Sequence, residues 1–551
     1  MTSRRKNTAA KRSAAPARTT PIPAGPANAP LNDVWRDWLV VALVALGASF
    51  AGIINDYALD DIALVQTNAR MHSLSHWLDI LTRPYWPPPY QQDLYRPVVS
   101  LLLAAEYTLG NGAPIVLRVV SYALYAGVAL ALFALASRLF SRRVALVVAA
   151  LFAAHPVHVE AVALGVNQAE LIVGLIAVAM VIRYVDARRA GRLTAADWTV
   201  LTLLYAGAAL TKENGFILPG LLLAAECCVI DGPPVRERAG MLWRGYGVMA
   251  LTGLALLGIR AAVLSGDMVG AFTSEALVGL GVGGRLLTML KVVPVWLRLL
   301  AWPAHLQVDY GPDEMVASTS FGAGEALGLA LVVGVVALAV AARRRAPLIS
   351  FGVAWFAVAI VPVSNVLVPT SIVLAERTLF LPSIGFLFAA AAAAVVAARW
   401  LQHRFAMRQE SLREAIGFAC LALVLLGLLR SAARERVWMN PVRLWAASAV
   451  DAPRSIRVRK AHEDAVADLT ADFNARIAAS PTPWRERFLM ARLLRAMGED
   501  SAAVTQLRRS LAERPDQPDV AAALTELGAG GATAVQRPQA ARDSSPERRP
   551  R

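Results

Sequence analysis

The chain has 551 residues, of which 56% are apolar and only 17% are charged, and its mean hydropathy is +0.49. About a quarter of the residues in soluble globular proteins are charged, so this composition excludes an ordinary soluble enzyme. Three cysteines are too few for a disulfide-stapled scaffold. The net charge of +15 indicates basic cytoplasmic loops of a membrane protein, and no nucleic-acid partner is expected.

Apolar runs of membrane-spanning length follow a basic N-terminal segment. Residues 1–34 are rich in Ala, Pro and Thr, which predicts a disordered cytoplasmic tail. Uninterrupted apolar runs of roughly 18 residues predict transmembrane helices, and the alternating pattern of a transmembrane barrel is absent from the sequence. We therefore predict an all-α polytopic membrane domain over residues 35–431, with eleven spans near 37–54, 114–137, 144–162, 168–185, 197–211, 214–230, 245–263, 323–342, 347–366, 378–398 and 415–431.

The basic residues predict the orientation of these spans. Residues 286–302 are also apolar, but they contain Lys291 and Arg298, so we predict an interfacial helix there instead of a span. With the N-terminus in the cytoplasm, every basic cluster faces that side, the C-terminal region lies outside, and the positive-inside rule is satisfied. These clusters are Arg138, Arg142 and Arg143; Arg183, Arg188, Arg189 and Arg192; Arg236, Arg238 and Arg244; Arg343, Arg344 and Arg345; and Arg399, Arg404 and Arg408.

Two long loops are predicted outside the membrane, over residues 55–113 and 264–322. Loops of this length are more often functional than simple connectors. The first loop carries an acidic pair, then an aromatic and proline-rich stretch over residues 85–90, then Tyr95 and Arg96. We expect this loop to pack on the outer membrane surface.

The composition becomes charged and helical after residue 431, which predicts a C-terminal helical region over residues 432–527. Pro481 and Pro515 are 34 residues apart, the period of tetratricopeptide repeats. We predict one or two degenerate repeats that provide a protein contact, with a generic helical tail as the alternative. Residues 528–551 are rich in Gly, Ala, Pro and Arg and predict a disordered tail.

Ionisable residues gather at the predicted outer ends of the spans. Such residues near bilayer depth cost free energy and are functional-site hypotheses by default. The candidates are Asp60, Asp61, Arg96, His155, His158, Glu160, Glu170, Lys212, Glu213, Glu376 and Arg377.

Asp60 and Asp61 form the candidate catalytic pair. Adjacent carboxylates repel each other when both are ionised, so the pKa of one tends to be raised. Such a group suits a general base that activates a hydroxyl. The alternative is a solvated helix N-cap, a position that Asp commonly occupies.

Three cations, Arg96, Lys212 and Arg377, suit the binding of a lipid phosphate by charge-assisted hydrogen bonds. For the two arginines, the alternative is snorkelling to lipid headgroups. For Lys212, the alternative is a structural pair with its neighbour Glu213.

His155 and His158 are three residues apart, with Glu160 two residues further on. A divalent metal site is conceivable from these ligand types but is not favoured. We favour a proton-handling or substrate-binding role, with satisfied interhelical hydrogen bonds as the alternative.

The order of these motifs resembles a known family. The chain is similar, over about residues 35–530, to the transmembrane and tetratricopeptide repeat-containing O-mannosyltransferases, which are GT-C membrane glycosyltransferases. The motifs that carry the resemblance are Asp60-Asp61, Tyr95-Arg96-Pro97, the run from His155 to Glu160, Leu210-Thr211-Lys212-Glu213, and the run from Ala375 to Ser383.

The resemblance implies a GT-C-like bundle, a polyprenyl-phosphate-linked sugar donor, an extracytoplasmic active site in the cell membrane, and inverting transfer to a hydroxyl. The lipid-linked sugar is a donor substrate, and no cofactor is assigned beside it. One of the paired aspartates would be the base, and which one stays open. The resemblance further implies that substrate is bound by Arg96, Tyr95, His155, His158, Glu160, Lys212, Glu213, Glu376 and Arg377.

The weak repeats depart from the family pattern, because long arrays supply the surface that binds a polypeptide. The acceptor therefore stays open between a protein hydroxyl, a lipid-linked saccharide and a cell-envelope polymer. Two other function classes compete with the enzyme. A transporter or flippase of lipid-linked sugars would show internal repeats and midplane charges, and a membrane-anchored scaffold would need a convincing repeat array.

Overall fold

The computed structural model describes residues 31–90, 92–191, 193–232, 235–265, 273–405 and 407–530. The predicted tails up to residue 30 and from residue 531 lie outside the described residues, and so does Arg192 of the predicted basic clusters. Every regular element within the described residues is a helix.

Seven helices in the described part of the chain are long and apolar enough to cross a membrane, which confirms an all-α polytopic membrane protein. An eighth is added if α5 (Arg142–Ala153) and α6 (Val159–Ala163), which are bent by 48° at η5 (Pro156–His158), form one broken span. The seven are α1 (Leu31–Ser49), α4 (Ile115–Leu139), α7 (Gln168–Arg189), α10 (Val235–Val263), α12 (Ala323–Ala342), α14 (Phe380–Phe405) and α15 (Gln409–Glu435).

Three other predicted spans coincide with shorter helices. These are α8 (Ala195–Thr211), α9 (Leu218–Cys228) and α13 (Pro347–Ile360). At a rise of 1.5 Å per residue, an 11-residue helix such as α9 covers about half of a hydrocarbon core that is about 30 Å thick. The count of eleven spans therefore stays a prediction.

The predicted interfacial segment forms one helix, α11 (Val282–Ala301), which contains Pro294 and packs against α12. A Cβ atom on Gly328 would lie 1.8 Å from the Leu290 carbonyl oxygen, so the two helices cross in close contact. The depth of α11 relative to a bilayer stays a prediction.

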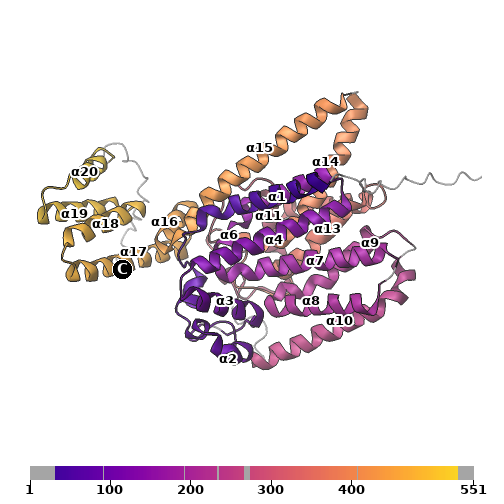
Figure 1. Cartoon of the computed structure of the whole chain (residues 1–551), viewed down its shortest axis with the longest axis horizontal. Coiled ribbons are helices and arrows are strands. Elements are labelled where there is room, and N and C mark those ends of the chain that lie inside the picture. The colour runs from indigo at the N-terminus through magenta and orange to yellow at the C-terminus, as the bar shows by residue number, and fades with distance from the viewer. Residues whose placement is uncertain are drawn as a thin grey trace, which may run out of the picture.

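The helices of the membrane domain run side by side along the long axis of the molecule (Figure 1). The outer-loop helices α2 (Trp77–Thr82) and α3 (Pro97–Gly110) lie at the end that also carries the C-terminal helices. Predicted inner loops meet at the opposite end, where Arg138 pairs with Asp186 at 2.8 Å and Arg188 pairs with Glu226 at 2.8 Å. The two predicted faces therefore lie at opposite ends of the bundle, although which of them is cytoplasmic stays a prediction.

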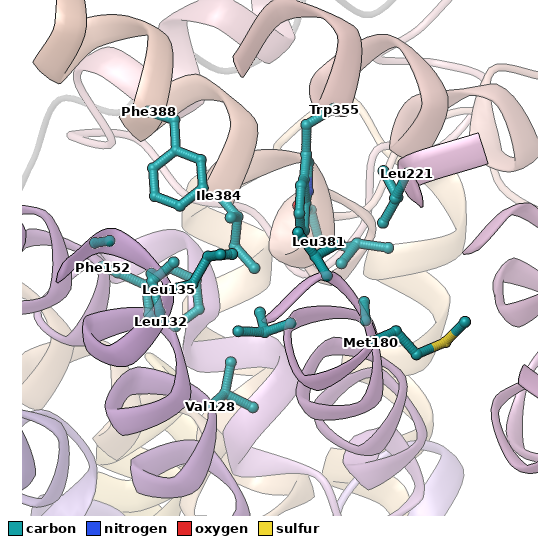
Figure 2. Packing of buried hydrophobic residues seen from close by; sticks show 14 of the residues in the cluster. Val128, Leu132, Leu135, Phe152, Met180, Leu221, Trp355, Leu381, Ile384 and Phe388 are labelled. Carbon is teal, nitrogen blue, oxygen red and sulfur yellow. The ribbon is translucent and has the colours of Figure 1, made fainter. Parts of the chain in front are cut away.

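The main hydrophobic core lies between α4, α5, α7, α9, α13 and α14. Figure 2 shows Leu132 and Leu135 of α4 next to Phe152 of α5, with Trp355 and Phe388 on the facing helices. The crossing of α13 and α14 is close, because a Cβ atom on Gly352 would lie 2.4 Å from the Ala389 backbone nitrogen. Small residues at such crossings let membrane helices approach backbone to backbone.

A second core lies beneath the first outer loop and draws on distant parts of the chain. Tyr57 and Tyr85 of this loop pack with Val308 of the second outer loop. Trp438 of η11 (Arg436–Met439) and Leu444 of α16 (Pro441–Asp451) join the same cluster and are wholly buried. The segment that follows the last membrane helix is therefore part of the support of the outer loops.

The remaining C-terminal helices are α17 (Ile456–Ala479), α18 (Pro483–Ala496), α19 (Asp500–Glu513) and α20 (Pro518–Gly530). They have a small core of their own, in which Ala491 and Leu494 face Ala503 and Leu507. Small and apolar residues at the contact of two adjacent helices are typical of a repeat helix pair. Membership in the tetratricopeptide family stays a prediction.

Candidate functional site

The two aspartates of the first outer loop lie in different environments, and Asp61 is the one that points inward. Asp61 is wholly buried and is the N-cap residue of the five-residue π-helix η2 (Ile62–Gln66). Its carboxylate forms an ion pair with Arg118 of α4 at 3.2 Å. It also accepts the backbone N–H groups of Gly165 at 3.0 Å and Val166 at 2.9 Å. These bonds occupy the carboxylate, so Asp61 is held as a structural group.

Asp60 has the opposite environment. Its half-buried side chain makes no hydrogen bond to any described residue. Burial raises the pKa of the Asp60 carboxyl; the Arg377 charge opposes this shift, Asp61 adds to it, and Arg96 opposes it. Asp60 is therefore the carboxylate of the pair that can accept a proton from a bound molecule.

The predicted cations form ion pairs with carboxylates from distant parts of the chain. Burial lowers the pKa of Lys212, Glu170 opposes this shift, and the nearby charges of Arg96 and Arg377 add to it. The alternative in which Lys212 is neutralised by its neighbour does not match the structure. The pairs are Arg96 with Glu213 at 2.7 Å, Lys212 with Glu170 at 2.5 Å, and Arg377 with Glu160.

Local structure explains how these side chains converge. Arg96 precedes the first turn of α3, while Glu213 begins η7 (Glu213–Ile217) directly after α8. Burial disfavours the charge of Glu213, but its ion pairs with Arg96 and Arg260 outweigh that effect and lower its pKa to about 2. The Nη1 group of Arg96 makes no hydrogen bond within the described part of the chain, so this guanidinium retains donors for a further anion.

The two histidines are engaged in hydrogen bonds. Nδ1 of His155 accepts the Val157 N–H at 3.3 Å, and its Nε2 lies 2.9 Å from the Leu300 carbonyl oxygen of α11. Nε2 of His158 lies 2.9 Å from Ser383 Oγ, and its Nδ1 lies 3.0 Å from the Tyr125 hydroxyl. This geometry matches the alternative of satisfied interhelical hydrogen bonds.

Metal binding by the histidines would require these bonds to break. Glu160 does not join the two rings, because its carboxylate is bound to the side chain and backbone N–H of Arg377. Within the described ranges, no group of three or more His, Cys, Asp and Glu side chains could hold a metal ion. His155 and His158 instead border a small cavity together with Glu435.

Tyr95 and Glu376 form hydrogen bonds with residues of the two outer loops. The Tyr95 hydroxyl donates to the Leu81 carbonyl oxygen at 2.8 Å, within the first outer loop. Glu376 opens η10 (Glu376–Leu379), is wholly buried, and accepts the Gln307 N–H at 2.6 Å and the Tyr310 hydroxyl at 3.0 Å. Both residues support the loops that position the charged groups.

The chain is similar to several animal protein O-mannosyl-transferases. It is 26% identical over 420 residues to protein O-mannosyl-transferase TMTC3 of Mus musculus. This match covers 70% of this chain and 44% of the mouse protein. It is 24% identical over 478 residues to TMTC4 of Mus musculus (76% and 62%) and 31% identical over 301 residues to Tmtc2 of Drosophila melanogaster (51% and 30%). The predicted resemblance is confirmed.

The chain spans about half the length of the curated relatives it matches. No family model matches the chain, and no solved structure matches it significantly. The similarity to O-mannosyl-transferases, together with the apolar helices, supports a membrane glycosyltransferase.

Two charged residues beside the site were not among the candidates from the sequence. Arg118 lies within the predicted span 114–137, and Arg260 lies within the predicted span 245–263. Both are buried, at 0% and 7% exposure. A lone arginine inside an apolar run is a signal of a functional or paired group, and that signal could have identified both residues.

Proposed function

We propose that the chain is an integral membrane glycosyltransferase of the inverting GT-C type. It transfers a hexose, mannose-like by resemblance, from a polyprenyl-phosphate donor to an acceptor hydroxyl on the extracytoplasmic face of the cell membrane. The names of the relatives, which are protein O-mannosyl-transferases, support a protein hydroxyl as the acceptor, and hence protein O-glycosylation.

The environment of Asp60 is the observation that carries this proposal. Asp60 makes no hydrogen bond to the described residues, and the charges of Arg377 and Arg96 act on it, whereas Asp61 is occupied by Arg118. A carboxylate with these properties suits a general base. Of the two aspartates, we therefore assign the base to Asp60.

The proposed reaction needs a general base and cations that stabilise a phosphate, and we assign both to this site. Asp60 takes the proton of the acceptor hydroxyl as its oxygen attacks the anomeric carbon of the donor sugar. The bond from that carbon to the phosphate oxygen breaks, and the lipid phosphate leaves with the bonding electrons. Arg96, Lys212 and Arg377 would stabilise the charge that develops on this phosphate. Their carboxylate partners hold them in position before the donor binds.

The test is sugar transfer in isolated membranes from polyprenyl-phosphate-linked hexoses, with the product separated into protein, lipid and polymer fractions. We expect Asp60→Asn to lower transfer by about 100-fold or more, the usual contribution of a general base. Asp79→Asn, an exposed carboxylate of the same loop, is the matched control and should remain active. The labelled fraction identifies the acceptor class.

Full activity of the Asp60→Asn variant would remove the base assignment. Equal label in every fraction for wild type and variant, with every donor tried, would instead favour the transport of a lipid-linked sugar. Binding of a protein through the C-terminal helices without any sugar transfer would favour the scaffold.

A further inference from the structure

Helix α10 carries a buried arginine at its outer end although most of its surface faces outward. Only 17% of the residues in its most apolar 18-residue stretch are buried. The exposed side chains include Leu251, Leu254 and Leu257. Arg260, one turn before the helix ends, is 7% exposed and turns into the bundle. An arginine near a membrane interface can snorkel to water at little cost, so its inward direction needs an explanation.

The contacts of Arg260 place it beside the predicted phosphate-binding cations. Its Nη1 donates to Glu213 Oε1 at 2.9 Å, and its Nη2 donates to the Asp93 carbonyl oxygen at 2.8 Å. Glu213 also accepts bonds from Nε and Nη2 of Arg96. One carboxylate is therefore shared by two guanidinium groups, which bring ten N–H donors between them.

The shared carboxylate does not exhaust these donors. Neither Nη1 of Arg96 nor Nε of Arg260 makes a hydrogen bond within the described ranges. The Glu213 side chain is 31% exposed, so the cluster is open. The Asp93 carboxyl lies near this cluster. Burial raises the pKa of Asp93, a hydrogen bond from its own backbone N–H opposes this shift, and the charge of Glu213 adds to it.

A matched arrangement at the other end of α10 shows what a closed cluster looks like. Arg238 donates to Glu226 at 2.7 Å, and Glu226 also accepts from Arg188 and Tyr184. The Glu226 side chain is 0% exposed, so this cluster has no access for a ligand. The difference in access separates a structural ion-pair cluster from one that can bind an anion.

We propose that Arg260 is a further binding residue for a lipid phosphate, and that the donor lipid approaches the site along α10. Its phosphate group would bind between Arg260 and Arg96, where guanidinium groups can donate paired hydrogen bonds to phosphate oxygens. Its hydrocarbon chain would lie on the outward apolar face of the helix, against Leu254 and Leu257. This inference rests on the proposed function, because it concerns the donor of the same reaction.

The experiment measures thermal unfolding of the purified full chain in detergent as ligand is added. The probes are a short-chain polyprenyl phosphate, the corresponding polyprenol without phosphate, and inorganic phosphate. A ligand that binds the folded state raises the unfolding temperature. We expect the polyprenyl phosphate alone to stabilise the wild-type protein.

The variants separate binding from structure. Arg260→Gln should need about 10-fold more polyprenyl phosphate for the same stabilisation, which corresponds to about 1.4 kcal/mol of binding free energy. Arg238→Gln removes a comparable ion pair from the same helix and should titrate like the wild type. Arg260→Lys keeps the charge but not the paired donors, so we expect intermediate binding; it also carries the test if Arg260→Gln does not fold.

Each outcome is decisive. Equal titrations for wild type, Arg260→Gln and Arg260→Lys would overturn the role of Arg260 and leave the proposed donor intact. Equal stabilisation by inorganic phosphate or by the polyprenol would overturn the lipid-phosphate site. If no lipid phosphate stabilised the wild type, the proposed donor class would fall, and this inference with it.

Discussion

Asp61 and Arg118 form an ion pair at 3.2 Å in which both side chains are wholly buried. Removing one partner of a buried pair leaves an uncompensated charge and costs about 3–5 kcal/mol. Asp61→Asn is therefore expected to lower the unfolding temperature strongly in detergent. A thermal scan of the variant beside Asp79→Asn measures this effect, and an unchanged unfolding temperature would show that the pair is not structural.

Asp60→Asn, unlike Asp61→Asn, is expected to stabilise the protein at neutral pH. Burial raises the pKa of Asp60 above its ordinary value, so the folded state favours the protonated form. The contribution of this carboxyl to stability is present at low pH and is lost as pH rises through the raised pKa. At pH 7 the neutral Asn should raise the unfolding temperature slightly, whereas at pH 3 the two proteins should unfold alike. A lower unfolding temperature of Asp60→Asn at pH 7 would show that burial does not disfavour the ionised Asp60 carboxylate.

The pH dependence of sugar transfer should report the same carboxyl. A general base must be ionised, so activity should rise with pH and its acid-side midpoint should lie above the pKa of an ordinary aspartate. Arg377 lowers the pKa of Asp60, so Arg377→Gln should move this midpoint to higher pH in addition to slowing transfer. Arg377→Lys retains the charge and should keep the midpoint close to that of the wild type. Identical pH profiles for the two variants would argue against Asp60 as the titrating group.

The close crossing of α13 and α14 should not tolerate a larger side chain. A Cβ atom on Gly352 would lie 2.4 Å from the Ala389 nitrogen and 2.5 Å from the Gly385 carbonyl oxygen, so the backbones must move apart. We expect Gly352→Ala to destabilise the protein by about 1–3 kcal/mol, the usual cost of overpacking. Gly247→Ala on α10 is the control, because a Cβ atom there meets nothing within 4 Å. Equal stability of both variants would contradict the close crossing.

The orientation in the membrane can be measured with fused reporters. A reporter that is active only outside the cytoplasm should be active after Pro453, between α16 and α17, and silent after Arg345, between α12 and α13. This expectation follows from the basic loops, which favour the cytoplasmic side. The reverse pattern would place Asp60 and its neighbouring cations in the cytoplasm and would remove the extracytoplasmic donor.

The sequence by itself determined the membrane character, the helix positions and the set of charged residues near the site. Hydropathy and run length report the local free energy of transfer into lipid, so ten of the eleven predicted segments each overlap one α-helix and the segment 144–162 overlaps two, α5 and α6. The ordered motifs were also sufficient for the family resemblance. Span length is less well determined, because α9 begins only at Leu218, after η7, and α13 already ends at Ile360.

Only the tertiary structure decided what each charged residue does. Asp60 and Asp61 are neighbours with the same chemistry, yet Arg118 and the backbone of residues 165 and 166 select one of them for burial. Lys212 pairs with Glu170 instead of its neighbour Glu213. Hydrogen bonds and ion pairs act over about 3 Å in space, whereas these partners are 42 to 105 residues apart in the chain, so no local pattern contains them.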